Sequence, residues 1–223
     1  MKLQECILYL LLLSACRIGY GNGVEEIQNS TNKSIIKRVL PGLQKTFLKN
    51  PTFNKELQLE ILAMQAEDQA IRANDLLKID VNKMVEVDQK HNQRLKEIIS
   101  EFGWPGLRLV GLKGSSGMWL LVQHQDNDLE FQKICLSLLK DAVEKQDAQY
   151  RDYAYLLDRV RMNEGSLQVY GTQWIQKEGK FSLYPVEDRV QLNLRRQEAG
   201  LCTIEEYQAE LQQIYHLQET DFE

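Results

Sequence analysis

The stretch Gly117-Met118-Trp119-Leu120-Leu121-Val122-Gln123-His124-Gln125-Asp126-Asn127-Asp128 brings an apolar run directly up to a histidine and two carboxylates. Residues 118–122 are all apolar, which favours a buried helix over one with a solvated face. Asp128 suits the beginning of the next helix, because the positive end of the helix dipole stabilises a carboxylate. The stretch therefore predicts a corner between two helices, where a buried segment meets a polar joint.

Apolar residues continue at helical spacing on both sides of this corner. Gly103-Trp104-Pro105-Gly106 ends one expected helix, because proline keeps the preceding residue out of helical geometry and glycine frees the turn. Weak alternation around Lys177-Glu178-Gly179-Lys180 predicts a small β-hairpin within residues 167–184. We expect a mainly α fold, an irregular helical domain that carries this hairpin. The expected helices are 54–73, 81–102, 118–125, 128–146, 149–163, 189–199 and 204–217, with residues 107–112 as a link and residues 114–117 as the start of the third.

The composition is that of an ordinary globular protein, with 223 residues, 43% of them hydrophobic, and a net charge of -5. This length fits one domain with a sizeable core. No tract of lysine and arginine marks a surface for nucleic acid, so we expect no nucleic-acid partner.

The N-terminus resembles an export signal. Lys2 precedes an apolar run that is too short to span a bilayer, and Leu13-Ser14-Ala15-Cys16 resembles the lipobox of bacterial lipoproteins. We therefore expect a signal peptide over residues 1–15, lipidation of Cys16, a flexible tether over 16–33 and a single helical domain over 34–223. The predicted location is the cell envelope, anchored to the membrane; the alternative is an ordinary secretory signal and a secreted or periplasmic protein.

Two of the four cysteines, Cys135 and Cys202, belong to the expected mature domain. Cys135 lies on an apolar helical stripe, where a free cysteine behaves as a small hydrophobic residue. We expect two free thiols. The chain has neither a Cys-x-x-Cys motif nor cysteines and histidines at zinc-binding spacing, so no metal site is predicted.

An ordered series of sequence blocks resembles one bacterial family, the domain of unknown function (DUF) family 6624, over about residues 55–210. The resemblance implies a mostly helical fold and brings no activity, cofactor or partner with it. The blocks are Leu62–Met64 with Glu67–Gln69 and Arg72, Val87–Pro105, Trp119–Gln132, Ala154–Gln173, and more weakly Arg195–Tyr207.

The candidate catalytic residues are His124, Asp126 and Asp128. An imidazole beside carboxylates binds transition metals, and a His–Asp pair also makes a general base whose tautomer the carboxylate sets. The same residues have a purely structural alternative, in which both aspartates cap the next helix and His124 bonds the last carbonyls of the preceding one. His91 is the only plausible second imidazole.

A second group of candidate residues follows the expected fifth helix. Tyr170, Thr172 and Gln173 form a polar segment that could bind a substrate, or could be a turn in which Gly171 supplies backbone freedom. Arg159 would bind a carboxylate or phosphate if it faced a pocket. An ion pair between Asp68 and Arg72, one helical turn apart, is expected on the surface.

Two functions are compatible with these observations. One is a membrane-tethered lipoprotein that binds an unknown ligand or protein partner. The other is a hydrolase-like enzyme that uses a His–Asp pair at His124 and substrate-binding residues among His91, Arg159, Tyr170, Thr172 and Gln173. No nucleophile elbow, P-loop or dinucleotide-binding fingerprint is present, and the sequence identifies no cofactor.

Overall fold

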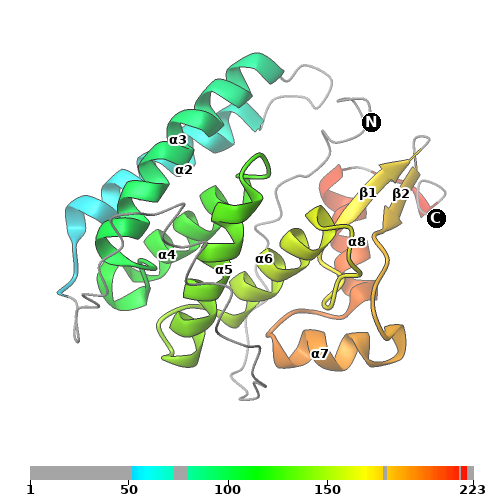
Figure 1. Ribbon diagram of the computed structural model, residues 1–223. Helices are drawn as coiled ribbons and strands as arrows, with labels where there is room; N and C mark the ends of the chain where they lie inside the picture. Colours follow the sequence, from blue (N-terminus) through cyan, green and yellow to red (C-terminus); the bar gives the residue numbers. More distant parts are fainter. Residues whose placement is uncertain (1–51, 73–79, 178–179, 216, 220–223) are drawn as a thin grey trace. The chain divides into compact units, whose positions relative to one another are not determined.

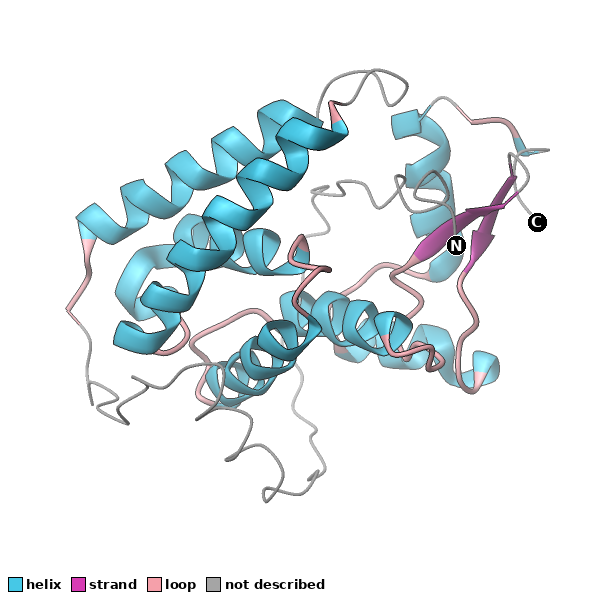
Figure 2. Ribbon diagram, turned by 45° about the horizontal axis from the view of Figure 1, so that its top comes forward, coloured by secondary structure: helices cyan, strands magenta, loops and turns pink. Residues whose placement is uncertain are grey.

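The computed structural model describes residues 52–72, 80–177, 180–215 and 217–219 (Figure 1). The predicted signal peptide 1–15, the lipidation at Cys16, the tether 16–33 and the first part of the predicted domain lie outside these residues. The described chain forms two compact units, 52–156 and 157–219, and each is considered on its own. The fold is mainly α with one small hairpin, as predicted (Figure 2).

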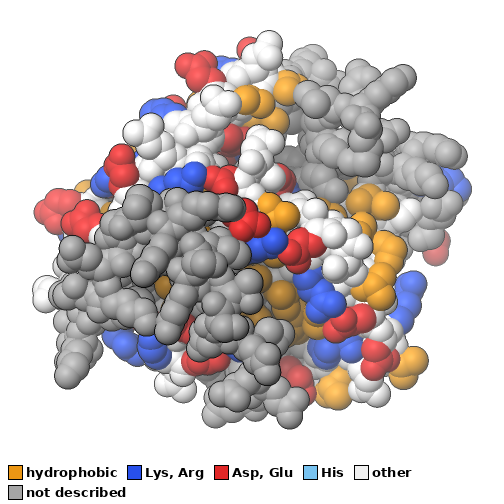
Figure 3. Space-filling view, in the orientation of Figure 1, with side chains coloured by type: hydrophobic (Ala, Val, Ile, Leu, Met, Phe, Trp, Pro, Cys, Tyr) orange, Lys and Arg blue, Asp and Glu red, His pale blue; other side chains and the backbone are white. Residues whose placement is uncertain are grey.

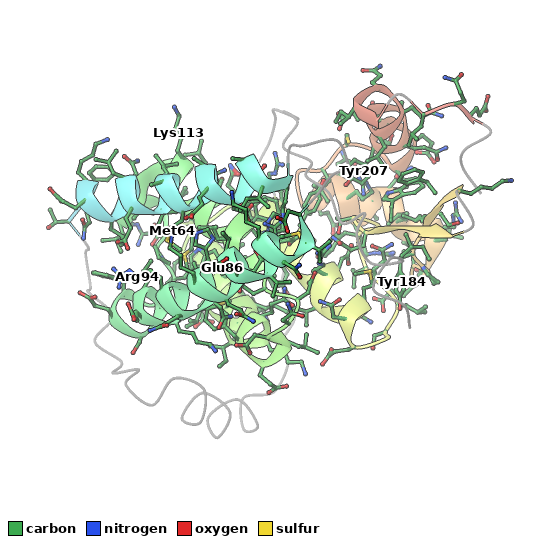
Figure 4. All side chains as sticks on the ribbon, turned by 90° about the horizontal axis from the view of Figure 1, so that it is seen from above. Met64, Glu86, Arg94, Lys113, Tyr184 and Tyr207 are labelled. Carbon is green, nitrogen blue, oxygen red and sulfur yellow. The ribbon has the colours of Figure 1, made fainter. Side chains whose placement is uncertain are left out.

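The first unit is built from helices that meet on apolar stripes. α2 (Lys55–Arg72) and α3 (Val81–Phe102) run side by side in Figures 1 and 2. The side chain of Asp80 caps α3 by accepting a hydrogen bond from the backbone N–H of Lys83 at 3.1 Å. Both helices agree with their predicted ranges to within a residue or so. Their buried apolar residues include Leu57, Ile61, Met64, Leu95, Ile98 and Ile99, and Met64 is labelled in Figure 4.

α4 (Leu107–Gln123) begins earlier than predicted. Residues 107–112 are not a link and residues 114–117 do not start the helix; both lie within α4, which kinks at Gly111, where φ is 68°. A Cβ atom at Gly117 would lie 2.9 Å from Oε1 of Gln65, so this glycine lets α2 approach α4 closely. The small residues that suggested a cap are therefore explained by helix packing.

α5 (Leu129–Glu144) and α6 (Tyr150–Asn163) follow close to their predicted ranges, and α6 leads into the second unit. Cys135 is fully buried on α5 and is a free thiol, as predicted. Burial raises the pKa of the Cys135 thiol well above its usual value, so this sulfur is a core group and an unreactive one.

The second unit holds the predicted hairpin. β1 (Trp174–Lys177) and β2 (Lys180–Leu183) pair antiparallel, with Trp174 opposite Leu183, and occupy only the second half of the range 167–184. A 3-10 turn, η3 (Arg189–Gln191), then leads into α7 (Leu192–Glu198), and α8 (Ile204–Tyr215) follows. In the stretch before β1, Gln168 forms an isolated bridge with Val186, while the backbone N–H groups of Val169, Tyr170 and Thr172 bond to the side chain of Asp158.

Candidate functional site

Four charged or titratable side chains are buried together in the first unit. Arg72 of α2 donates from Nη2 to both carboxylate oxygens of Asp88 on α3, at 2.8 and 2.9 Å, and from Nη1 to Asp68. Nδ1 of His124, at the end of α4, lies 2.9 Å from both Oδ1 and Oδ2 of Asp68. None of the four residues is more than 8% exposed, so a continuous polar network connects three helices inside the core.

Helical geometry brings these residues together. Asp68 and Arg72 are one turn apart on the inner face of α2, and Asp88 occupies the inner face of α3. His124 is held at the C-terminal cap of α4, where its backbone N–H bonds to the carbonyl of Leu120 at 3.3 Å. The prediction that Asp68 and Arg72 form a surface ion pair is therefore wrong, because α3 and His124 cover both groups.

The charges of this network define the tautomer of His124. Burial by itself raises the pKa of Asp68, but His124 and Arg72 more than compensate and leave it below its usual value. Burial raises the pKa of Asp88, which Arg72 opposes. Because the ionised Asp68 only accepts hydrogen bonds, Nδ1 of His124 carries a hydrogen, and the lone pair of a neutral ring resides on Nε2. Within the described part of the chain, no hydrogen bond engages Nε2.

The two predicted carboxylate partners of His124 lie elsewhere. Asp128 caps α5 by accepting from the N–H of Phe131 at 3.2 Å, and it forms an ion pair with Lys96 of α3. Asp126 accepts from Nε2 of Gln132 at 3.3 Å. The helix-capping alternative thus describes Asp128, whereas the imidazole of His124 bonds to Asp68 and not to the last carbonyls of α4.

His91 lies one turn beyond Asp88 on α3 but has a different partner. Its Nε2 is 3.1 Å from the carboxylate of Glu67, which also bonds to Lys90. Those two hydrogen bonds, from Lys90 and then His91, hold the pKa of Glu67 below its usual value. His91 is 1% exposed, and its Nδ1 has no partner among the described residues. His91 is therefore a neighbour of the network and not a member of it.

The second group of predicted residues surrounds Asp158 in the second unit. The Asp158 carboxylate accepts hydrogen bonds from the backbone N–H groups of Val169, Tyr170 and Thr172 and from Oγ1 of Thr172, over 2.7 to 3.1 Å. Burial raises the pKa of Asp158, and these hydrogen bonds oppose that effect. Nη1 of Arg159 donates to Oε1 of Gln173 at 3.2 Å.

The opposite side of the same segment is held by Arg196, which is fully buried on α7. Arg196 donates to the carbonyls of Tyr170, Gly171 and Cys202 at 2.7, 3.1 and 2.6 Å, and its guanidinium stacks on the ring of Tyr207 at 5.0 Å. Tyr207, labelled in Figure 4, also donates from its hydroxyl to the carbonyl of Thr172 at 3.3 Å. The segment from Val169 to Gln173 is thus fixed by a carboxylate on its N–H side and a guanidinium on its carbonyl side.

Gly171 adopts a φ of +65°, which favours glycine. A Cβ atom there would come within 3.3 Å of Leu192 and Ile204. The backbone of this segment is therefore a turn that needs Gly171, which is one of the two interpretations of its sequence.

Several residues of both clusters were not predicted as site residues. Asp88, Asp158 and Arg196 are polar residues on the apolar faces of their helices. This position was the feature of the sequence that could have marked them as buried site residues. His124 and His91 belong to the first unit, while Arg159, Tyr170, Thr172 and Gln173 belong to the second.

Comparison with known protein families gives a match that covers both buried clusters. Residues 55–220 match the model of a family of unknown function, DUF6624. The chain belongs to this family. No curated protein and no solved structure matches it. The match confirms the resemblance seen in the sequence and extends about ten residues beyond the predicted end at 210.

Two further findings concern possible membrane and metal sites. Among the helices of the described residues, none combines the length and apolar character needed to cross a membrane. Across residues 52–72, 80–177, 180–215 and 217–219, no three histidine, cysteine or acidic side chains are grouped to hold a metal ion.

Proposed function

We propose that this member of the family is a hydrolase-like enzyme in which His124 acts as a general base through Nε2. The single observation that carries the proposal is the buried contact of 2.9 Å between Nδ1 of His124 and both oxygens of Asp68. A carboxylate in this position fixes the imidazole ring and its tautomer and stabilises the imidazolium formed when Nε2 takes a proton. Arg72 in turn donates a hydrogen bond to Asp68, so Arg72 orients the imidazole ring through Asp68.

The charge balance of the network concerns the imidazolium that a general base must become when it accepts a proton. With Asp68 and Asp88 ionised, the network has two negative charges against the one positive charge of Arg72. Uptake of a proton by His124 makes the four side chains neutral overall. The negative charge of the network therefore offsets the positive charge of the imidazolium that forms during the reaction.

The test is a panel of p-nitrophenyl esters, p-nitrophenyl phosphates and amino-acid p-nitroanilides, assayed with the full chain and with His124→Gln and Asp68→Asn. We expect turnover of at least one class, abolition by His124→Gln, and a loss in kcat of roughly 10²- to 10⁴-fold for Asp68→Asn. His91→Gln is the matched control, since it changes another buried imidazole of the same unit. Circular dichroism checks that each variant is folded.

Diethyl pyrocarbonate supplies a second readout, because it modifies the free nitrogen of an accessible imidazole. We expect modification of His124 to eliminate activity. Failure of the whole panel together with an unmodified His124 would reject the proposal. A compound that stabilises the wild type and the His124→Gln variant equally, and that is not turned over, would instead identify a binding protein.

We also propose that the protein is exported and held at the membrane by a lipid on Cys16. Supporting this is the sequence Leu13-Ser14-Ala15-Cys16 after an apolar run. We expect the wild-type chain in the membrane fraction of a bacterial host and the Cys16→Ser variant outside it, with Cys202→Ser as the control. Unchanged fractionation of Cys16→Ser would reject lipidation, and a shortened chain in the soluble periplasmic fraction would indicate ordinary secretion.

A further inference from the structure

Asp88 belongs to the buried network but lies at the far end of it from His124. Its carboxylate accepts hydrogen bonds from Arg72, and Arg72 also donates to Asp68, which contacts Nδ1 of His124. Asp88 is only 8% exposed. Burying a carboxylate is costly, so the presence of a second one beside Arg72 calls for an explanation.

Arg72 divides its two terminal nitrogens between the two carboxylates. Nη2 donates to both oxygens of Asp88, at 2.8 and 2.9 Å, whereas Nη1 donates to Oδ1 of Asp68. A guanidinium that faces one carboxylate commonly gives it two parallel hydrogen bonds. Because Asp88 occupies Nη2, Arg72 gives Asp68 a single hydrogen bond.

This division leaves the carboxylate of Asp68 directed at His124. Nδ1 of His124 lies 2.9 Å from both Oδ1 and Oδ2, and Nε2 of Gln69 donates to Oδ2 at 2.8 Å. With no acceptor at position 88, Nη2 of Arg72 would be released to turn to Asp68 and compete with the imidazole for the same oxygens. Asp88 therefore protects the contact that fixes the ring of His124.

Asp88 also offsets the charge of Arg72. A guanidinium and an imidazolium that bind the same carboxylate repel each other. With Asp88 ionised, its charge balances that of Arg72, and Asp68 remains to balance the imidazolium. With a neutral residue in place of Asp88, the group of Asp68, Arg72 and protonated His124 would carry a net positive charge.

We propose that Asp88 is a positioning residue of the His124 centre and acts through Arg72. It keeps Asp68 directed at the imidazole, and it offsets the guanidinium charge that the imidazolium would otherwise meet. This role rests on the proposed function of His124 as a general base. Asp88 lies on α3, Asp68 on α2 and His124 at the end of α4, so all three helices contribute to the centre.

The two carboxylates of the network respond differently to acid. Burial raises the pKa of Asp88, which Arg72 opposes, whereas the pKa of Asp68 is below its usual value. The charged and titratable groups that act on Asp88 are Arg72 and Asp68 from α2 and His124 from α4. As the pH falls, Asp88 takes up a proton before Asp68 does, and the wild-type centre comes to resemble one with a neutral residue at position 88.

Nuclear magnetic resonance of the full chain tests this role without any substrate. The ¹⁵N signals of the His124 ring, assigned by comparison with His124→Gln, report the tautomer and the pH at which the ring takes up a proton. In the wild type we expect the neutral ring to carry its hydrogen on Nδ1. Asp88→Asn keeps an acceptor for Nη2 of Arg72 and removes only the charge, so the titration midpoint of the His124 ring should fall by about 0.5 to 1 pH unit.

Two further variants separate geometry from charge. Asp88→Ala removes the acceptor as well, so the His124 ring should also populate the tautomer with its hydrogen on Nε2. Asp88→Glu keeps the charge, and its midpoint should lie closer to that of the wild type than to that of Asp88→Asn.

Kinetics provide a second readout on whichever p-nitrophenyl ester, p-nitrophenyl phosphate or p-nitroanilide the wild type turns over. Asp88→Asn should lower kcat by roughly 10-fold and change KM little, because a weaker base affects the chemical step and not substrate binding. The acid limb of the pH profile should move to lower pH, together with the NMR midpoint.

Glu67→Gln is the matched control. It removes the same charge from the residue next to Asp68, but the side chain of Glu67 is 41% exposed and contacts His91 rather than the network. This variant should move the ring signals of His91 and leave those of His124 in place.

The wild type supplies a measurement that does not depend on any variant. Because Asp88 and His124 interact, the ¹³C carboxyl signal of Asp88 should show a second step at the pH at which His124 titrates. If an Asp88 variant does not fold, this step decides the question.

The outcomes separate the role of Asp88 from the proposed function. His124 signals that are the same in the wild type and in Asp88→Asn, or the lack of a second step for Asp88 in the wild type, would overturn the role of Asp88 even if turnover depends on His124. A shifted His124 midpoint in Asp88→Asn with no turnover of any substrate would instead reject the proposed function and leave the coupling between Asp88 and the imidazole in place.

Discussion

Replacing Asp152 with asparagine will change how the free energy of unfolding depends on pH. Asp152 lies in the first turn of α6 and is 2% exposed. Its carboxylate has one long hydrogen bond, 3.5 Å from Oγ of Ser116 on α4, and lies 3.8 Å from Nε of Arg151. Burial with so little compensation raises the pKa of Asp152 to about 7.

The direction of the effect follows from proton binding. In the unfolded chain the carboxyl has a pKa near 3.8, so between that pH and about 7 the native state holds a proton that the unfolded state has lost. The stabilising contribution of protonated Asp152 is fully present below about pH 4 and is lost as the pH rises through about 7. At about 1.4 kcal/mol for each unit of pKa difference, the full effect is about 4 kcal/mol.

Urea unfolding followed by circular dichroism, at several values between about pH 4 and pH 8, measures this effect. Asparagine mimics the protonated carboxyl, so the variant and the wild type should have similar stability at the acid end. At the alkaline end, Asp152→Asn should be more stable by up to about 4 kcal/mol. Asp141→Asn, at an exposed position of α5, is the control. A stability difference that stays constant with pH would refute the reasoning.

Further predictions concern the two buried clusters. Arg72→Met leaves two buried carboxylates without their cation and should lower the free energy of unfolding by about 3–5 kcal/mol, measured by urea unfolding. The loss should be smaller in acid. A loss below about 1 kcal/mol would contradict a buried network. Asp158→Ala removes the acceptor of backbone N–H groups within residues 169–172, so hydrogen exchange at those amides should accelerate. Protection equal to that of the wild type would show that other groups hold the segment.

Basic and acidic side chains are interspersed on the face shown in Figure 3, as expected for a chain with a small net negative charge. The residues of the His124 network, in contrast, are buried.

Most helices could be predicted because their signals are local. An apolar residue every three or four positions identifies a helix, and Gly103 with Pro105 marks the end of one. The start of α4 was missed for the opposite reason: glycines at 111, 114 and 117 resemble a loop in sequence, and only packing against α2 shows that they belong to a helix.

For the candidate site, the sequence by itself determined that His124 lies at a polar joint after a buried helix and that Asp128 starts the next one. Only the tertiary structure decided that the partner of His124 is Asp68, 56 residues away, and that Asp158 binds the segment that contains Tyr170 and Thr172. The physical reason is the range of the interactions. Periodicity and capping depend on residues within a turn or two, whereas the partner of a buried charge depends on which helices pack together.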